Sequence, residues 1–187
     1  ISSMLKKYWN DPLYRFLTKA VFLYVIWHVL YDLFLHPQGA LDMVVIRNLE
    51  SLSRGVLDLI GFTTIEESQV DNIRTIGIDG THGVWIGDPC NGLTLFALFT
   101  GFLLAYPGPI KHKLWFLPVG LLAIHLINVV RILGLALIVY FFPDPEVLDF
   151  NHTYTFTIFV YSFVFLLWYI WATKFVQPTK PAKDEKE

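Results

Sequence analysis

The sequence predicts an all-α integral membrane protein with about four transmembrane helices, an interfacial amphipathic helix and a small outer β-hairpin. Three observations support this fold class: of 187 residues 55 % are hydrophobic, only 16 % are charged, and the mean hydropathy is +0.51. These values are high for a soluble domain. The charged residues also gather between long apolar runs, which is typical of a chain that crosses a bilayer several times.

Four apolar runs are the candidate spans. The first covers about residues 16–35 and is long enough for one bilayer crossing. The second, residues 91–106, is short and must extend or cross a thinned region. The third, residues 114–142, contains Arg131 as its only formal charge, and the last, residues 152–173, contains no Asp, Glu, Lys or Arg.

Residues 41–62 are too charged to span a membrane, and they predict an amphipathic helix that lies on the membrane surface or caps the bundle. At about 100° per residue the charged side chains share one face and apolar side chains share the opposite face. The charged face holds Arg47, Glu50, Arg54 and Asp58, and the apolar face holds Val45, Leu49, Leu52, Val56 and Ile60.

The polar segment that follows predicts a β-hairpin. Residues 73–78 and 83–86 are β-prone and are separated by the turn signal Asp79-Gly80-Thr81-His82. The hairpin leads directly into Pro89-Cys90 and could therefore form one wall of a site.

The distribution of Lys and Arg predicts the orientation. The N-terminal flank, residues 111–113 and the C-terminal tail are basic, whereas residues 143–151 form an acidic loop without Lys or Arg. The positive-inside rule then places both termini in the cytoplasm and residues 36–89 outside. This predicts a multi-pass membrane protein.

We expect one membrane-embedded domain over residues 4–175. Residues 176–187 are rich in Lys and are predicted to be a disordered cytoplasmic tail. Residues 1–3 precede Met4 and are interpreted as an artificial remnant.

Cys90 is the only cysteine of the chain, and it lies where the polar segment gives way to an apolar helix. Asp88, Pro89 and Asn91 are helix-start residues, so Cys90 is expected at or just before a helix N-terminus. The helix dipole there favours an anion and is expected to lower the thiol pKa, which suits a nucleophile. The alternative is that Cys90 is a small buried hydrophobic residue.

The predicted topology brings two further polar residues to the outer side. Arg131 lies in the outer half of the third span, with Asn128 on nearly the same face and His125 a turn below, and His152 begins the fourth span. An arginine in a spanning helix marks a candidate functional site. The third run would be about 43 Å long as a helix, against a hydrocarbon core of about 30 Å, so we expect it to project outward.

These groups suit acyl transfer. Cys90 would attack a peptide carbonyl, His152 would act as base and acid, and Arg131 would stabilise the thiolate or the oxyanion. Structural roles are the alternatives: Arg131 could pair with Asp32 as a lock between helices, and His152 could be an interfacial histidine beside a capping Asn151.

A second polar stripe lies at the end of the first run. His28, Asp32 and His36 are spaced one helical turn apart and could bind a metal. We favour a pair of His28 with Asp32 inside the bundle, with Asp32 and His36 near the outer interface, and expect no metal or cofactor.

Four sequence motifs resemble the exosortase/archaeosortase family, over roughly residues 87–175. They are Pro89-Cys90-Asn91-Gly92-Leu93, Tyr106-Pro107-Gly108-Pro109, Asn128-Val129-Val130-Arg131-Ile132 and Asp149-Phe150-Asn151-His152. The order Cys, Arg, His on successive outward-facing positions matches the family as well. The short chain is most similar to versions from Bacteroidetes-type bacteria, which implies a location in the bacterial inner membrane.

The resemblance implies a cysteine protease or transpeptidase that cleaves exported proteins through a thioester acyl-enzyme. Its substrates would carry a C-terminal motif, a membrane helix and a basic tail, with a lipid or glycan as an open alternative for the acceptor and no nucleic acid as partner. The resemblance assigns Cys90 as nucleophile, Arg131 as stabiliser and His152 as third catalytic residue, with Asn128, Asn91 and Asn151 in support. Longer members have more helices before this core, whereas this chain has one span there.

A non-enzymatic function is the alternative interpretation. A small membrane carrier or assembly factor could use His125, Asn128 and Arg131 as an intramembrane polar path. Four spans without internal repeats make a transporter the weaker alternative.

Overall fold

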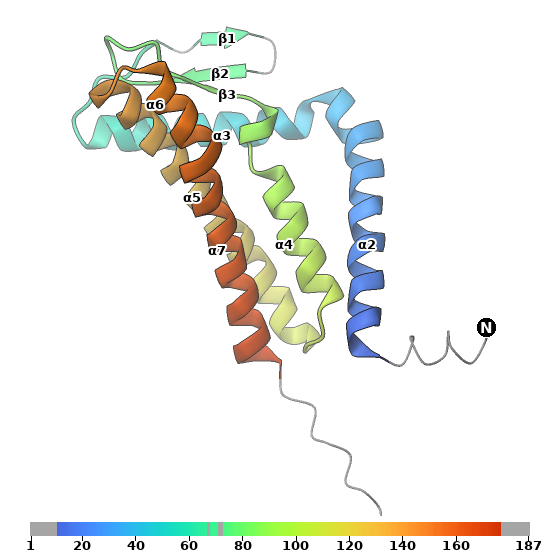
Figure 1. Cartoon of the computed structure of the whole chain (residues 1–187). Helices are drawn as coiled ribbons and strands as arrows, with labels where there is room; N and C mark the ends of the chain where they lie inside the picture. The colour runs from blue at the N-terminus through green and yellow to red at the C-terminus, as the bar shows by residue number, and fades with distance from the viewer. Residues whose placement is uncertain (1–10, 67, 71–72, 177–187) are drawn as a thin grey trace, which may run out of the picture.

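Four helices run side by side in the computed structural model, and a fifth helix and a small sheet lie across one end of them (Figure 1). The structure describes residues 11–66, 68–70 and 73–176. The predicted remnant at residues 1–3 lies outside these residues, and so does the predicted tail from residue 177 on.

The helices of the bundle follow one another in space as α2, α4, α5 and α7. Their bounds are Pro12–Leu30 for α2, Leu93–Ala105 for α4, Ile110–Phe141 for α5 and Phe156–Ile170 for α7. The start of α2 and the end of α7 lie at the end of the bundle opposite the sheet (Figure 1). Both described ends of the chain therefore lie on one side, and the sheet lies on the other.

Three helices in the described part of the chain are long and apolar enough to cross a membrane. They cover Pro12–Gln38, Ile110–Phe141 and Pro145–Phe175. The fourth helix, α4, has 13 residues and is about 20 Å long, which is less than a hydrocarbon core of about 30 Å. The predicted membrane fold is confirmed, with three candidate spans, and α4, the predicted second span, is as short as its apolar run.

Helix α3, Ala40–Leu59, crosses the end of the bundle instead of running along it (Figure 1). The predicted amphipathic helix is therefore present, but its faces are used differently than expected. The predicted apolar face is divided, because Leu49 is buried whereas Leu52 and Val56 are exposed. Glu50 of the predicted charged face is buried and pairs with Arg54 at 3.1 Å. The sheet covers this side of the helix, and burial there requires the two opposite charges to pair.

The predicted hairpin is part of a three-stranded antiparallel sheet in the order β1-β2-β3. The strands are Ser68–Val70, Ile73–Ile76 and Val84–Ile86, and Thr75 of β2 lies opposite Trp85 of β3. The hairpin of β2 and β3 with its turn is confirmed. The sequence analysis missed β1, whose three residues are too few for a strand signal.

The segment expected as an acidic loop is largely helical. Helix α6, Pro145–Phe150, begins with Pro145 at its first position, and the Asp144 side chain accepts a 2.9 Å hydrogen bond from the Glu146 amide. Asp-Pro is a helix-start signal as well as a turn signal. Here the hydrogen bond of the Asp144 side chain stabilises the helix start. Helix α6 continues through a π-helical turn, Asn151–Thr155, into α7.

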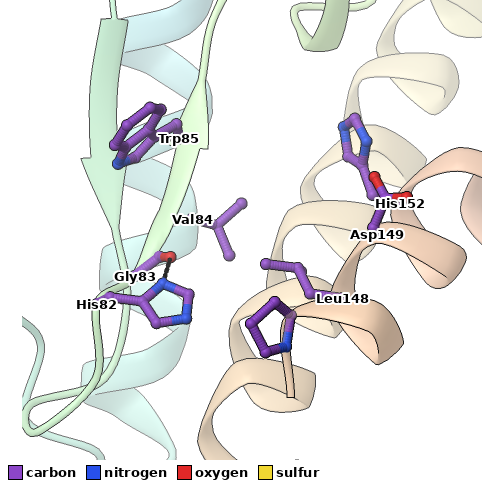
Figure 2. A pocket seen from close by; sticks show the side chains of 8 residues that line it. His82, Gly83, Val84, Trp85, Leu148, Asp149 and His152 are labelled. Atoms are coloured by element: carbon purple, nitrogen blue, oxygen red, sulfur yellow. Dashed lines mark hydrogen bonds between the residues drawn. The ribbon is translucent and has the colours of Figure 1, made fainter. Parts of the chain in front are cut away.

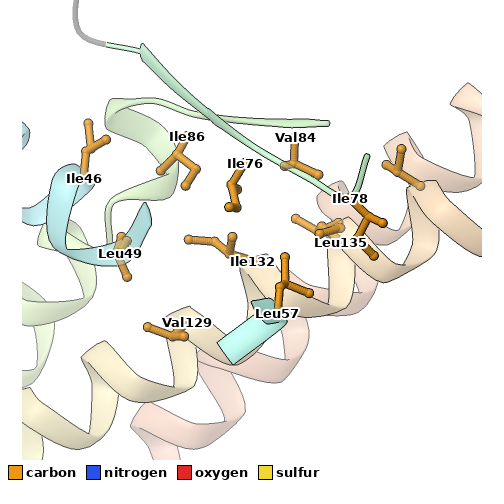
Figure 3. Close-up of a cluster of buried hydrophobic side chains, with 12 residues drawn as sticks. Ile46, Leu49, Leu57, Ile76, Ile78, Val84, Ile86, Val129, Ile132 and Leu135 are labelled. Carbon is orange, nitrogen blue, oxygen red and sulfur yellow. The ribbon is translucent and has the colours of Figure 1, made fainter. Parts of the chain in front are cut away.

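Two clusters of buried apolar side chains divide the molecule. The bundle core joins α4, α5 and α7 and consists of Leu95, Phe99, Leu103, Phe116, Ile124, Val160, Val164, Leu167 and Trp171. The cap core joins α3, the sheet and the far part of α5, as Figure 3 shows. It consists of Ile46, Leu49, Leu57, Ile76, Ile78, Val84, Ile86, Val129, Ile132, Leu135, Ala136 and Val139. Helix α5 is about 48 Å long and reaches from one core into the other.

Candidate active site

Cys90 is the last residue of a short 3₁₀ turn, Asp88–Cys90. Two residues separate it from Leu93, where α4 begins. The Asn91 side-chain oxygen accepts a 2.9 Å hydrogen bond from the Leu93 amide, so Asn91 helps to cap α4 as expected. Gly92 has a φ of 85°, and a Cβ there would lie 3.1 Å from Asn128 Nδ2. A residue without a side chain is therefore needed for the turn to approach α5 this closely.

His152 lies within the π-helical turn that joins α6 to α7. Its Nε2 atom lies 3.0 Å from the Cys90 sulfur, although 62 positions separate the two residues. A thiol and an imidazole at this distance can exchange a proton.

Arg131 is buried on α5, with 8 % of its surface exposed. Its terminal nitrogen Nη2 points at the Cys90 sulfur from 3.9 Å, and its Nε atom is buried without a hydrogen-bond partner. The alternative ion pair with Asp32 is absent, since the Asp32 carboxylate lies 3.2 Å from His28 Nδ1. The three predicted residues thus meet in the structure, at the end of the bundle where the sheet lies.

The three predicted supporting asparagines have different surroundings. Asn128 is buried and donates a 2.9 Å hydrogen bond to the Cys90 carbonyl oxygen, which ties the turn to α5. Asn91 donates a 2.7 Å hydrogen bond to Asp42. Asn151 donates a 2.8 Å hydrogen bond to the carbonyl oxygen of Val147 in the preceding helix α6. Asn128 and Asn91 therefore hold the turn on both sides of the sulfur.

The electrostatic environment of Cys90 differs from the expectation. Burial raises the pKa of the Cys90 thiol above its usual value, and the Arg131 guanidinium acts in the opposite direction with a smaller effect. The expected lowering of this pKa is therefore wrong. Desolvation of a thiolate outweighs the attraction of one nearby cation. The resting pair is a neutral thiol beside an imidazole, so a base has to remove the proton during reaction.

A cleft of about 440 Å³ leads to His152 between strand β3 and helix α6. Figure 2 shows Val84 and Trp85 on the strand side, and Leu148 and Asp149 on the helix side. The Trp85 side chain is 71 % exposed. The hairpin therefore forms one wall of the site, as the sequence predicted.

A cluster beside Cys90 was missed by the sequence analysis. His36, Asp42 and Asp88 each present a ligand-type atom, and all three atoms lie within 4.8 Å of one another. Burial and, to a smaller extent, the Asp42 carboxylate raise the pKa of Asp88, whereas His36 acts in the opposite direction. A signal did exist: Asp42 is in phase with the buried Ile46 and Leu49, which places a carboxylate on the buried stripe of α3.

The predicted stripe of His28, Asp32 and His36 is not formed. A π-helical turn, Tyr31–Leu35, and a 3₁₀ turn, His36–Gln38, end the first long helix and direct His36 toward Asp42 and Asp88. The pair of His28 with Asp32 is present, but both side chains are about half exposed and do not lie inside the bundle.

The polar stripe on α5 has fixed protein partners. His125 bonds Asn48 of α3 at 2.6 Å, and Asn128 bonds the Cys90 backbone. A carrier path would need these groups to face a substrate, so their contacts with the protein disfavour such a path, and of the two residues Asn128 is the one that positions the turn of Cys90.

Comparison with protein families gives a match over most of the chain. The family model described as transmembrane exosortase (Exosortase_EpsH) matches residues 8–169, a range that contains Cys90, Arg131 and His152. No match is found among curated proteins or among solved structures.

Proposed function

We propose that this chain, which belongs to the transmembrane exosortase family, is a membrane-embedded cysteine protease or transpeptidase that cleaves the C-terminal sorting signal of exported proteins. The observation that carries this proposal is the 3.0 Å distance between the Cys90 sulfur and His152 Nε2, with the Arg131 guanidinium 3.9 Å from the same sulfur. A nucleophile, a base and a fixed positive charge are the groups that acyl transfer requires.

In the first half of the reaction His152 Nε2 takes the thiol proton, and the Cys90 sulfur forms a bond to the carbonyl carbon of the substrate peptide. The carbonyl oxygen becomes an oxyanion, and Arg131 supplies the positive charge beside it. The C–N bond then breaks, His152 returns the proton to the leaving amine, and a thioester on Cys90 remains.

In the second half an acceptor attacks this thioester. Water gives a carboxylic acid, and an acceptor amine or hydroxyl gives a transferred product. In both cases His152 removes the acceptor proton and gives it to the departing Cys90 sulfur. A lipid or glycan acceptor is therefore compatible with the same three residues.

The cleft between β3 and α6 supports an approach of the substrate peptide from the side of the sheet. His152 lines this cleft together with apolar side chains of β3 and α6. An extended peptide in the cleft would approach the Cys90 sulfur from the same side as His152. Its scissile carbonyl would then face the sulfur. The closed side of the site is formed by α5, which carries Arg131 and Asn128.

The proposed topology places the sheet and Cys90 on the periplasmic side of the inner membrane and both termini in the cytoplasm. The basic residues 111–113 and the opposite location of the sheet support it. In a Cys90→Ala background, Gly80→Cys should react with a membrane-impermeant thiol reagent on intact spheroplasts, and Lys111→Cys should react only after permeabilisation. The reverse labelling would refute this orientation.

The test of the function uses mass spectrometry of an exported protein with a C-terminal motif, membrane helix and basic tail, expressed with this chain. We expect removal of its C-terminus by the wild-type chain and an uncleaved substrate with Cys90→Ala. Thioester capture by hydroxylamine should also depend on Cys90. Equal cleavage by Cys90→Ala, in protein that inserts and folds, would contradict the proposal.

A further inference from the structure

The cluster of His36, Asp42 and Asp88 has no part in the proposed reaction, yet it adjoins the turn that carries Cys90. Its members come from three segments: the end of the first long helix, the first turn of α3, and the turn before α4. Their ligand-type atoms lie within 4.8 Å of one another. Such a convergence of one imidazole and two carboxylates needs a physical reason, because two close carboxylates repel each other.

Asp42 is the most informative member, because its side chain is fully buried. One carboxylate oxygen, Oδ1, accepts hydrogen bonds from the Tyr31 hydroxyl at 2.6 Å and from Asn91 Nδ2 at 2.7 Å. The other oxygen, Oδ2, is buried without a hydrogen-bond partner and faces His36 Nδ1. A buried carboxylate oxygen without a hydrogen-bond donor is costly, so a ligand bound at this atom would stabilise the folded protein.

The distances within the cluster fit a bound cation better than direct hydrogen bonds. His36 Nδ1 lies 3.8 Å from Asp42 Oδ2 and 3.6 Å from Asp88 Oδ2. A charged hydrogen bond between these groups would be about 2.7–2.9 Å long. Two ligand atoms on a tetrahedral zinc ion, each about 2.0–2.2 Å from the metal, lie about 3.3–3.6 Å apart. The two His36 distances lie at or slightly above this range, and no separation in the cluster exceeds 4.8 Å, so one ion could join the three side chains if it draws them slightly closer together.

We propose that His36 Nδ1, Asp42 Oδ2 and a carboxylate oxygen of Asp88 bind one divalent transition-metal ion of the zinc class. An imidazole with two carboxylates suits such an ion, whereas magnesium and calcium prefer sites made of oxygen ligands. Three protein ligands leave a fourth position for water. The half-exposed His36 side chain provides the route of entry.

Tyr31 and Asn91 orient the site from behind. Their hydrogen bonds to Asp42 Oδ1 leave Oδ2 directed at the metal position, as outer partners do in many metal sites. Asp88 and Asn91 also flank Cys90 in the sequence. A bound ion would thus join the turn of Cys90 to α3 and to the end of the first long helix, and so position the sulfur without taking part in the reaction.

The experiment uses the full chain in detergent, stripped with a chelator and titrated with zinc in competition with a chromophoric chelator. We expect one zinc ion per chain and a rise in the thermal unfolding midpoint, with magnesium and calcium much weaker. His36→Ala should weaken zinc binding at least about 10-fold, and Tyr31→Phe about 10-fold to 100-fold. His36 is half exposed, so its variant should fold even if Asp42→Asn does not.

Two controls separate this site from other zinc ligands. Cys90→Ala should keep the zinc ion, which excludes the Cys90–His152 pair as the binding site, and His28→Ala should bind like the wild type. Loss of zinc in Cys90→Ala with retention in His36→Ala would overturn the proposal, and so would the absence of saturable binding. The readout needs no substrate, so it stands or falls separately from the proposed function.

Discussion

The bundle core and the cap core differ in the polar residues that lie beside them. Among the described residues, the buried polar or charged ones are Asp42, Glu50, Ser53, Arg74, Asn91, Asn128 and Arg131. All of them belong to α3, to the sheet, to the turn before α4 or to the part of α5 from Asn128 onward. On α5 the bundle core ends at Ile124 and the cap core begins at Val129.

The bundle core and the cap core therefore have different structural roles. The bundle core is held almost entirely by packing, because its one polar side-chain group is the indole N–H of Trp171, which donates a 3.3 Å hydrogen bond to the Pro107 carbonyl oxygen. Each buried polar group of the cap needs a hydrogen bond or an ion pair in a defined direction. The candidate site lies at the junction, where the bundle supplies a rigid support and the cap supplies directed groups.

The largest effect is expected when the proton acceptor at this junction is removed. His152→Ala should lower the rate of substrate cleavage about 10²-fold to 10⁴-fold, because it removes the base that lies 3.0 Å from the Cys90 sulfur. The measurement is the initial rate of cleavage by mass spectrometry. His125→Ala is the matched control, since His125 contacts Asn48 and not the sulfur, and should stay within about 3-fold of wild type. Equal losses of cleavage rate in His152→Ala and His125→Ala would contradict the assignment of His152 as the base.

A somewhat smaller loss is expected for the charge on α5. Arg131→Lys keeps the positive charge but changes the geometry of the donors, so cleavage should slow about 10²-fold to 10³-fold. Arg15→Lys is the control, because Arg15 lies near the start of α2, at the opposite end of the bundle. Comparison of cleavage rates at equal protein levels decides the point, and a normal rate for Arg131→Lys would remove Arg131 from the chemistry.

The pH dependence of thiol alkylation tests the electrostatics of the junction. Burial raises the pKa of Cys90, so the rate with iodoacetamide should rise at higher pH than for a free cysteine. Because Arg131 opposes this effect, Arg131→Gln should move the midpoint further upward. Mass spectrometry of the alkylated chain across a pH series gives both midpoints. A midpoint below that of free cysteine would contradict the burial argument.

The smallest effect is expected for packing in the bundle. A Cβ at Gly120 of α5 would clash with the Phe99 ring, whereas a Cβ at Gly101 of α4 meets nothing within 4 Å. Gly120→Ala should destabilise the protein by about 1–3 kcal/mol through overpacking. Gly101→Ala should be neutral or stabilising by up to about 1 kcal/mol. Thermal unfolding in detergent compares them, and equal midpoints would show that the two helices can separate without cost.

Much of the bundle could be predicted from the sequence. A transmembrane helix has to satisfy its backbone hydrogen bonds internally, so a long apolar run leaves few alternatives. Residues 114–142 predicted one long helix, and α5 extends from the bundle core into the cap core. Its projection beyond the bilayer stays a prediction. The position of Cys90 before α4 followed from the helix-start residues around it.

The cap was harder to predict, because short polar segments have competing local signals. Asp144-Pro145 was predicted to lie in a loop, but it forms the start of α6. The three-residue β1 is defined by its pairing with β2 and not by its own composition. The apolar face expected on α3 is only partly buried, since the sheet covers Leu49 and leaves Leu52 exposed.

The sequence by itself determined that this chain is a helical membrane protein with one cysteine at a helix start and an arginine in a span, because hydropathy and helix signals act over a few residues. Only the tertiary structure decided that Cys90, Arg131 and His152 meet, and that His36 turns away from Asp32 toward Asp42 and Asp88. These contacts depend on where the first long helix ends and how α3 crosses the bundle. Side chains from distant segments occupy one place only when the packing of both cores brings their backbones together.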